Sequence, residues 1–212
     1  MMTMTAPVEQ PAAERFPLRA PFTVDLLFDL PESAERYEVL EGLLVVSPAP
    51  EPKHNLAADR LGRLLDPLLP DGVEVITNTA IRMPENDGAI PDLLVTSADP
   101  EQCSRGIPHD LVHTVVEVVS PSHPTVDRVV KKNLYAAAGI PCYWRVELRP
   151  WLRHLKPLPA IVVHMLDDNG DWQETIYGAG TTSTLPLVTG HRGPNVLAVE
   201  LDPAALVGPR RR

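Results

Sequence analysis

Apolar residues recur at helical spacing in one segment of the chain, between His54 and Leu69. Polar side chains fill the positions between them, which predicts an amphipathic helix with one buried face. Pro70-Asp71-Gly72 would end this helix. A second helix is predicted from about Thr125 to Ala138, and Gly139 would end it. The first pattern rests on Leu56, Leu61, Leu64, Leu65 and Leu68.

Runs rich in β-branched residues predict strands around these helices. The strongest run, Leu111 to Ser120, is dense in valine and is bounded by Pro108 and Pro121. The segment Tyr37–Ser47 predicts a hairpin, because two β-prone runs flank Glu41-Gly42. Further strands are predicted at 73–77, 80–83, 92–96, 141–148, 161–166, 172–177 and 196–201. The expected fold is α/β, a mixed β-sheet flanked by helices, with an additional C-terminal β-hairpin that extends the sheet.

The chain is long enough for one domain with appendages, since it has 212 residues, 44% of them hydrophobic. Residues 1–20 are rich in Pro, Ala and Glu and lack periodicity, which predicts a flexible N-terminal arm. The domain is expected to span residues 21–202. Residues 203–212 would form a C-terminal tail whose end, Arg210-Arg211-Arg212, is basic.

The formal net charge of -9 argues against a protein that coats nucleic acid, because phosphate contacts require Lys and Arg. Any contact with nucleic acid would need a local basic patch or bound cations. The two cysteines, Cys103 and Cys142, form no CxxC motif, and a reducing compartment is expected. No apolar run reaches the ~18 residues of a membrane span, and the N-terminus does not resemble a secretory signal. We therefore expect a cytoplasmic protein without membrane contact.

Glu117 is the first candidate for chemistry, because it interrupts the apolar run Val115–Val119. A carboxylate on a central strand is unfavourable unless it is paired or binds a cation. It could also be a strand-end glutamate that reaches solvent or a lysine. Asp92 follows Pro91 at the start of another predicted strand. If the two strands are neighbours, both carboxylates face each other, and a divalent cation would remove their repulsion. Alone, Asp92 could simply be a strand-entry residue.

Lys131 lies four residues after Asp127, so both side chains project from one face of the second helix. They could form an ordinary ion pair on the helix surface. Alternatively, Lys131 could lie beside a metal site. Its ammonium group would there stabilise a pentacoordinate phosphorane or orient an attacking water.

Several short motifs in a fixed order are similar to those of the Uma-two family. This bacterial family is regarded as endonucleases with the PD-(D/E)XK, restriction-endonuclease-like fold. The similarity covers roughly residues 35–148 and leaves C-terminal strands at about 160–202. The motifs are Tyr37-Glu38-Val39-Leu40-Glu41-Gly42, Pro91-Asp92, Val116–Ser122, Asp127-Arg128 with Lys131, Tyr135–Pro141 and Tyr143-Trp144.

The resemblance implies roles for these residues. Asp92 and Glu117 would be catalytic carboxylates that bind Mg²⁺ or Mn²⁺, and Glu38 would complete the metal site. The usual lysine of this fold would fall at position 119, which is Val119 here. Lys131 occupies the place to which this family moves the lysine, and is the third catalytic candidate.

Other residues are expected to surround the site. His54 stands where the family often has a histidine. Ser120 and Asp127 could contact the catalytic residues from the layer that surrounds them. Tyr135 and Trp144 are expected in the core. The family often carries an acid directly after the hairpin glycine, where this chain has Leu43.

The leading hypothesis is therefore a metal-dependent endonuclease that hydrolyses DNA phosphodiester bonds. DNA would contact a homodimer groove, the helix with Arg60 and Arg63, or the Arg210–Arg212 tail. One alternative is an inactive nuclease-fold module that binds protein or nucleic acid. Another is a hydrolase of small phosphodiesters, which an acidic surface would tolerate better.

Overall fold

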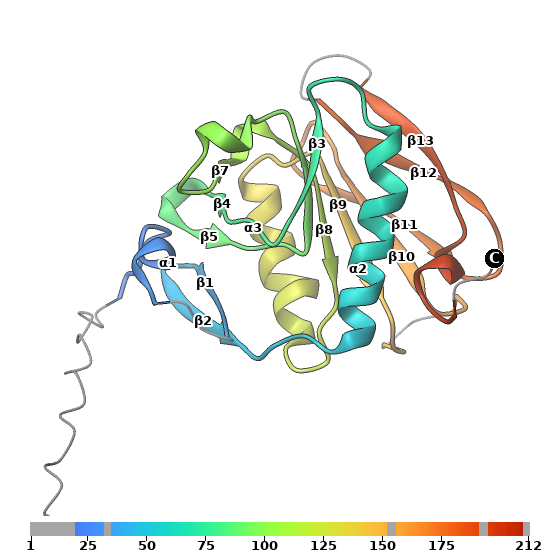
Figure 1. Cartoon of the computed structure of the whole chain (residues 1–212), viewed down its shortest axis with the longest axis horizontal. Helices are drawn as coiled ribbons and strands as arrows, with labels where there is room; N and C mark the ends of the chain where they lie inside the picture. Colours follow the sequence, from blue (N-terminus) through green and yellow to red (C-terminus); the bar gives the residue numbers. More distant parts are fainter. Residues whose placement is uncertain (1–19, 32–34, 152–155, 191–194, 210–212) are drawn as a thin grey trace, which may run out of the picture.

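The computed structural model describes residues 20–31, 35–151, 156–190 and 195–209. Its strands form three sheets (Figure 1). The central sheet has the order β11-β10-β9-β8-β6-β3. A five-stranded sheet, β2-β1-β5-β4-β7, is formed by the N-terminal half of the chain and lies beside the central sheet. The strands β12 and β13 form a separate pair.

The helices are α1 (Leu26–Asp29), α2 (Pro52–Leu65), α3 (Lys131–Ala137), the π-helix η5 (Val126–Val130), and the 3-10 turns η1 (Asp66–Leu68), η2 (Pro84–Asn86), η3 (Pro100–Gln102), η4 (His109–Leu111) and η6 (Pro203–Leu206). The strands are β1 (Arg36–Leu40), β2 (Leu43–Ser47), β3 (Glu74–Thr77), β4 (Ile81–Arg82), β5 (Gly88–Ala89), β6 (Leu93–Thr96), β7 (Ile107–Pro108), β8 (Val112–Val118), β9 (Cys142–Glu147), β10 (Ala160–Leu166), β11 (Trp172–Gly178), β12 (Ser183–Val188) and β13 (Val196–Leu201).

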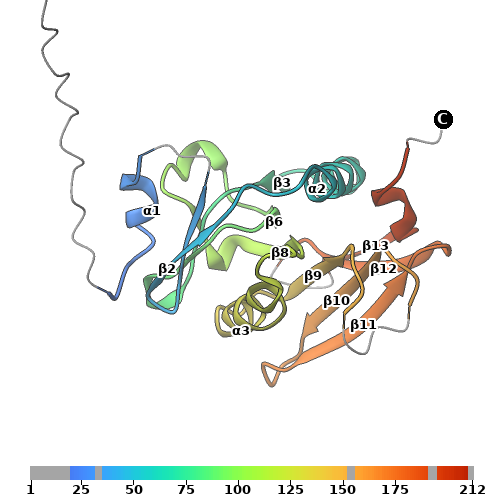
Figure 2. The ribbon, with the colours of Figure 1, turned by 90° about the horizontal axis from the view of Figure 1, so that it is seen from below.

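The middle strands of the central sheet, β6, β8 and β9, are buried on both faces, which explains why they are nearly continuously apolar. Val116 of β8 and Trp144 of β9 point to the face covered by α2 and the β12–β13 pair. Val115 and Tyr143, one position away, point to the face covered by α3 and the five-stranded sheet. Figure 2 shows α2 and α3 on these opposite sides. The alternation of side chains along a strand therefore assigns each residue to one of two cores.

The predicted fold class is confirmed, and most predicted elements are present. The hairpin at 37–47, the strongest strand and both principal helices appear within a few residues of their expected bounds. The helix predicted from 125 differs, because its first turn is the π-helix η5 and only the rest is α-helical. The 3-10 turn η1 continues α2 to Leu68.

The predicted C-terminal strands are present, and one further strand joins them. The β10–β11 hairpin extends the central sheet as expected, but β13 pairs only with β12. The strand β12 was not predicted because Pro186 interrupts its pattern, and a proline cannot donate to a strand ladder. The carbonyl of Pro186 nevertheless accepts a hydrogen bond from Trp144 Nε1 at 3.0 Å.

The first part of the predicted C-terminal tail has a regular structure. Residues 203–206 form η6, and Leu206 is buried in the core beside α2. This apolar burial holds the segment to the domain. All but the last residue of the predicted flexible arm, residues 1–19, lie outside the described residues. The basic tip Arg210–Arg212 also lies outside them. None of the helices in the described segments is long and apolar enough to cross a membrane.

The two cysteines are expected to differ strongly in reactivity. Cys142 is fully buried at the start of β9, and burial raises the pKa of its thiol to about 12, whereas Cys103 is partly exposed. Because the thiolate is the reacting species, a disulfide reagent near pH 8 should label Cys103 in the folded protein and Cys142 only after unfolding. A Cys103→Ser variant should show no rapid labelling. Equal labelling of both thiols in the folded protein would contradict the burial of Cys142.

Candidate active site

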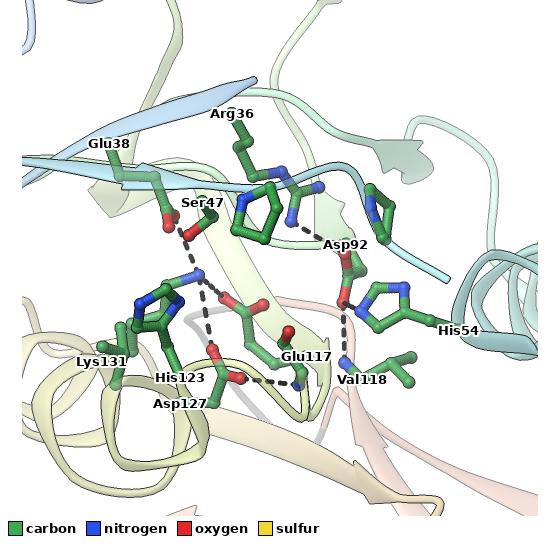
Figure 3. A pocket seen from close by; sticks show the side chains of 14 residues that line it. Arg36, Glu38, Ser47, His54, Asp92, Glu117, Val118, His123, Asp127 and Lys131 are labelled. Atoms are coloured by element: carbon green, nitrogen blue, oxygen red, sulfur yellow. Dashed lines mark hydrogen bonds and ion pairs between the residues drawn. The ribbon is translucent and has the colours of Figure 1, made fainter. Parts of the chain in front are cut away.

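A pocket opens at one end of the central sheet, where several distant segments of the chain meet (Figure 3). The hairpin β1–β2 forms one wall, and the first turn of α2 forms another. The ends of β6 and β8 and the helix after β8 complete it. Its lining residues are Arg36, Glu38, Ser47, Pro48, Pro50, His54, Asp92, Glu117, Val118, Ser120, His123, Val126, Asp127 and Lys131.

Asp92 and Glu117 are neighbours because β6 and β8 are adjacent antiparallel strands. Leu93 pairs with Val116, so the next residues in register, Asp92 and Glu117, lie beside each other. Both carboxylates are almost fully buried, with exposed fractions of 3% and 1%. The predicted adjacency of these two strands is confirmed.

Asp92 is held by three donors. Its Oδ1 accepts a hydrogen bond from Arg36 Nη1 at 3.0 Å, and its Oδ2 accepts one from Val118 N at 2.8 Å. His54 Nε2 lies 3.2 Å from the same Oδ2. Burial alone would raise the pKa of Asp92, but His54 and Arg36 lower it overall below its usual value. Asp92 is therefore an ionised carboxylate in a fixed orientation.

Glu117 is in a different electrostatic state. Burial raises the pKa of its carboxyl group to about 8. The charge of Lys131 opposes this rise, but the nearby carboxylates of Asp92, Asp127 and Glu38 add to it. Near neutral pH Glu117 is therefore largely protonated, and a bound cation would favour its ionised form.

Lys131 lies between carboxylates on the other side of Glu117 (Figure 3). Its Nζ is 2.8 Å from Glu117 Oε1, 2.9 Å from Glu38 Oε1 and 3.8 Å from Asp127 Oδ1. Burial lowers the pKa of Lys131, but these three acids raise it overall above its usual value. The ammonium group is thus a permanent positive charge, with an exposed fraction of only 2%.

The π-helix η5 positions Asp127 and the loop before it. Asp127 Oδ2 accepts a hydrogen bond from Ser120 N at 3.1 Å, and Asp127 O accepts one from Tyr143 OH at 2.9 Å. On the outer side of η5, Arg128 donates two hydrogen bonds to the buried Glu147, at 2.8 and 2.7 Å. This bidentate pair fixes η5 against β9.

All seven residues expected at or around the site are brought together. Glu38 also accepts a hydrogen bond from Ile90 N at 2.7 Å, which orients its carboxylate toward Lys131. Ser120 contributes its backbone to Asp127, while its hydroxyl pairs with that of Ser122. The seven residues are Glu38, His54, Asp92, Glu117, Ser120, Asp127 and Lys131.

The sequence analysis did not identify Arg36, Tyr135 or His123 as site residues. Arg36 precedes Glu38 by two positions on a strand, so their shared face could have been predicted. Tyr135 was expected only in the core. It is buried, but its hydroxyl donates to Glu117 Oε1 at 2.6 Å. His123 stands exposed at the mouth of the pocket, in a loop whose conformation no local pattern indicated.

The site offers a metal ion a pair of adjacent carboxylates rather than a complete protein cage. Within the segments that the structure describes, no group of three or more His, Cys, Asp or Glu side chains is arranged to hold a metal ion. Mg²⁺ commonly takes one or two carboxylates and completes its shell with water and substrate phosphate. The pair Asp92 and Glu117 fits such an ion better than one that needs a complete protein cage.

Comparisons with known proteins identify the family and the fold. The family model named Uma2, described as "Putative restriction endonuclease", matches residues 24–200. A crystal structure of a "putative nuclease belonging to DUF820" from Anabaena variabilis has a similar fold, with a TM-score of 0.57. The two sequences are 15% identical, and the match covers 79% of this chain and 89% of that chain. No curated protein matches this chain.

Proposed function

Because this chain belongs to the Uma2 family of restriction-endonuclease-like proteins, we propose that it hydrolyses DNA phosphodiester bonds as a metal-dependent endonuclease. Asp92, Glu117 and Lys131 would be its catalytic residues. The observation that carries the proposal is a pair of adjacent buried carboxylates with a buried ammonium group 2.8 Å from one of them.

The carboxylates of Asp92 and Glu117 would hold Mg²⁺ or Mn²⁺. When bound, such an ion polarises a phosphoryl oxygen and lowers the pKa of a bound water. Glu38 stays a candidate for a further ligand, although its Oε1 accepts from Lys131 and Ile90 here. Burial raises the pKa of Glu117, and the nearby carboxylates raise it further; a cation would offset both effects, which supports cation binding at this place.

Lys131 would act through its charge rather than by transferring a proton. Its pKa is raised above the usual value, so it stays protonated throughout the neutral range. A buried positive charge at a fixed position stabilises the negative charge that develops on phosphate oxygens during attack. Arg36 and His54 would keep Asp92 ionised and oriented.

The net charge of -9 bears on the substrate. A DNA duplex approaching an acidic surface would bind weakly and with strong dependence on salt. A small phosphodiester would meet less repulsion, and this observation supports a second candidate function, the hydrolysis of small phosphodiesters. Direct comparison of the two substrates separates these functions.

The experiment is nicking of supercoiled plasmid with Mg²⁺ or Mn²⁺, by wild-type protein and by Asp92→Asn. Wild type should nick the plasmid, and EDTA should abolish the reaction. Asp92→Asn should lose at least about 100-fold in rate, because it removes a charged ligand of the ion. Asp59→Asn, an exposed acid on α2, is the matched control and should retain activity.

Three outcomes are informative. Nicking that depends on Asp92 and on the metal supports the proposal. Hydrolysis of bis(4-nitrophenyl) phosphate without any nicking would favour the small-phosphodiester function. Absence of both activities, with no metal binding in calorimetry, would contradict the enzyme and favour an inactive module.

A further inference from the structure

Three polar residues at intervals of four form a column on the helix after β8. Asp127 belongs to η5, and Lys131 and Tyr135 belong to α3. All three side chains are buried, and all three lie toward Glu117. Tyr135 is the member for which neither the family resemblance nor the proposed catalysis gives a role.

A regular α-helix would not align this column well. Four α-helical residues rotate by about 400°, so each interval of four drifts by about 40° and the whole column by about 80°. A π turn contains more residues per turn, so four residues fall short of a full revolution. In η5, Lys131 N donates to Val126 O, five residues earlier. The drift across Asp127–Lys131 thus opposes the drift across Lys131–Tyr135, and the column stays in line.

The column has a specific effect on Glu117. Lys131 Nζ and Tyr135 OH both donate to Oε1, over 2.8 and 2.6 Å. In the described segments, the second oxygen, Oε2, has neither a hydrogen-bond nor an ion-pair partner. Glu117 lines the pocket, and Figure 3 shows this oxygen on the side of Asp92.

We propose that Tyr135 is a positioning residue that, with Lys131, holds one oxygen of Glu117 and so presents the other to the cation. The π turn is the device that brings Tyr135 into line with Asp127 and Lys131. The inference rests on the proposed metal-dependent function. A fixed orientation of this kind matters because partners behind a metal ligand commonly change metal affinity about 10- to 100-fold.

The test is calorimetric titration of the DNA-free protein with Mn²⁺. Tyr135→Phe should weaken Mn²⁺ binding about 10- to 100-fold and reduce nicking to match. Thr114→Val is the matched control. It also removes a buried hydroxyl, one that donates to the backbone carbonyl of Val188 on β12 instead of to Glu117, so its Mn²⁺ affinity should equal that of wild type. Unchanged Mn²⁺ affinity in Tyr135→Phe would overturn the inference.

A second variant tests the π turn. Deletion of Val129, which is 49% exposed, should convert η5 to a regular α-helical turn without opening the core. We expect a loss of Mn²⁺ affinity as large as that of Tyr135→Phe, while Val129→Ala binds as wild type does. A folded deletion variant with wild-type affinity would show that the alignment is not needed.

A double-mutant cycle keeps the inference testable if wild-type protein binds no Mn²⁺. That result would contradict the proposed function rather than the link between Tyr135 and Glu117. Unfolding midpoints in urea would then be compared for Tyr135→Phe, Glu117→Gln and the double variant. Non-additive shifts support the positioning role, and additive shifts overturn it.

Discussion

Replacing Glu117 with glutamine is expected to abolish nicking and, at alkaline pH, to stabilise the folded protein. The folded state raises the pKa of Glu117 from 4.5 to about 8, so it binds a proton that the unfolded chain has released. The contribution of Glu117 to the free energy of unfolding is therefore fully present below about pH 4.5. It is lost as the pH rises toward about 8. At about 1.4 kcal/mol per pH unit, the protein loses up to about 5 kcal/mol of stability. Glutamine avoids this loss because it carries no ionisable proton.

The measurement is urea unfolding of wild type and Glu117→Gln across this pH range. The two proteins should be similar in stability near pH 4.5, and the variant should become the more stable one as pH approaches 8. Glu74→Gln, at an exposed position on β3, should show no such trend. A variant that is less stable than wild type at every pH would show that ionised Glu117 stabilises the fold.

Replacing Lys131 with methionine is expected to destabilise the protein more than any exposed lysine substitution. Methionine preserves most of the volume but leaves Glu38, Glu117 and Asp127 without their shared cation. Removal of one partner from a buried ion pair typically costs about 3–5 kcal/mol. Nicking should be lost as well, since the fixed positive charge is gone.

The pH dependence distinguishes this explanation from loss of packing. The carboxylates would bind protons as the pH falls, so the destabilisation should shrink toward acidic pH and grow toward about pH 9. Lys132→Met, at the next and half-buried position, is the control and should change stability little. Adding Glu117→Gln to Lys131→Met should restore part of the stability. A loss that is independent of pH would indicate packing alone.

Much of the site could be predicted from the sequence because its residues interrupt patterns of known period. A carboxylate within a valine-rich strand and a lysine four residues after an acid are visible without a structure. Strand alternation could have placed Arg36 on the face of Glu38, but its pairing with Asp92 could not be predicted, because Asp92 lies 56 residues away. The roles of the site residues stay predictions until variants are measured.

The fold shows the same division between local and distant information. Helices and most strands follow from hydrophobic period, whereas the pairing of β13 with β12 depends on a strand that contains Pro186. The π turn is also invisible in the sequence, because the apolar positions of one turn fit an α-helix equally well. Its presence depends on tertiary contacts such as the Arg128–Glu147 pair.

The wide separation of the pocket residues along the chain has a consequence for biosynthesis. The walls are assembled from segments between Arg36 and Lys131, and the parallel pairing of β8 with β9 requires residues up to Val146. A nascent chain on the ribosome therefore lacks the pocket until most of the domain has been translated. Contacts between such distant segments form late in folding. A nuclease built in this way would acquire its hydrolytic capacity only as the finished domain closes.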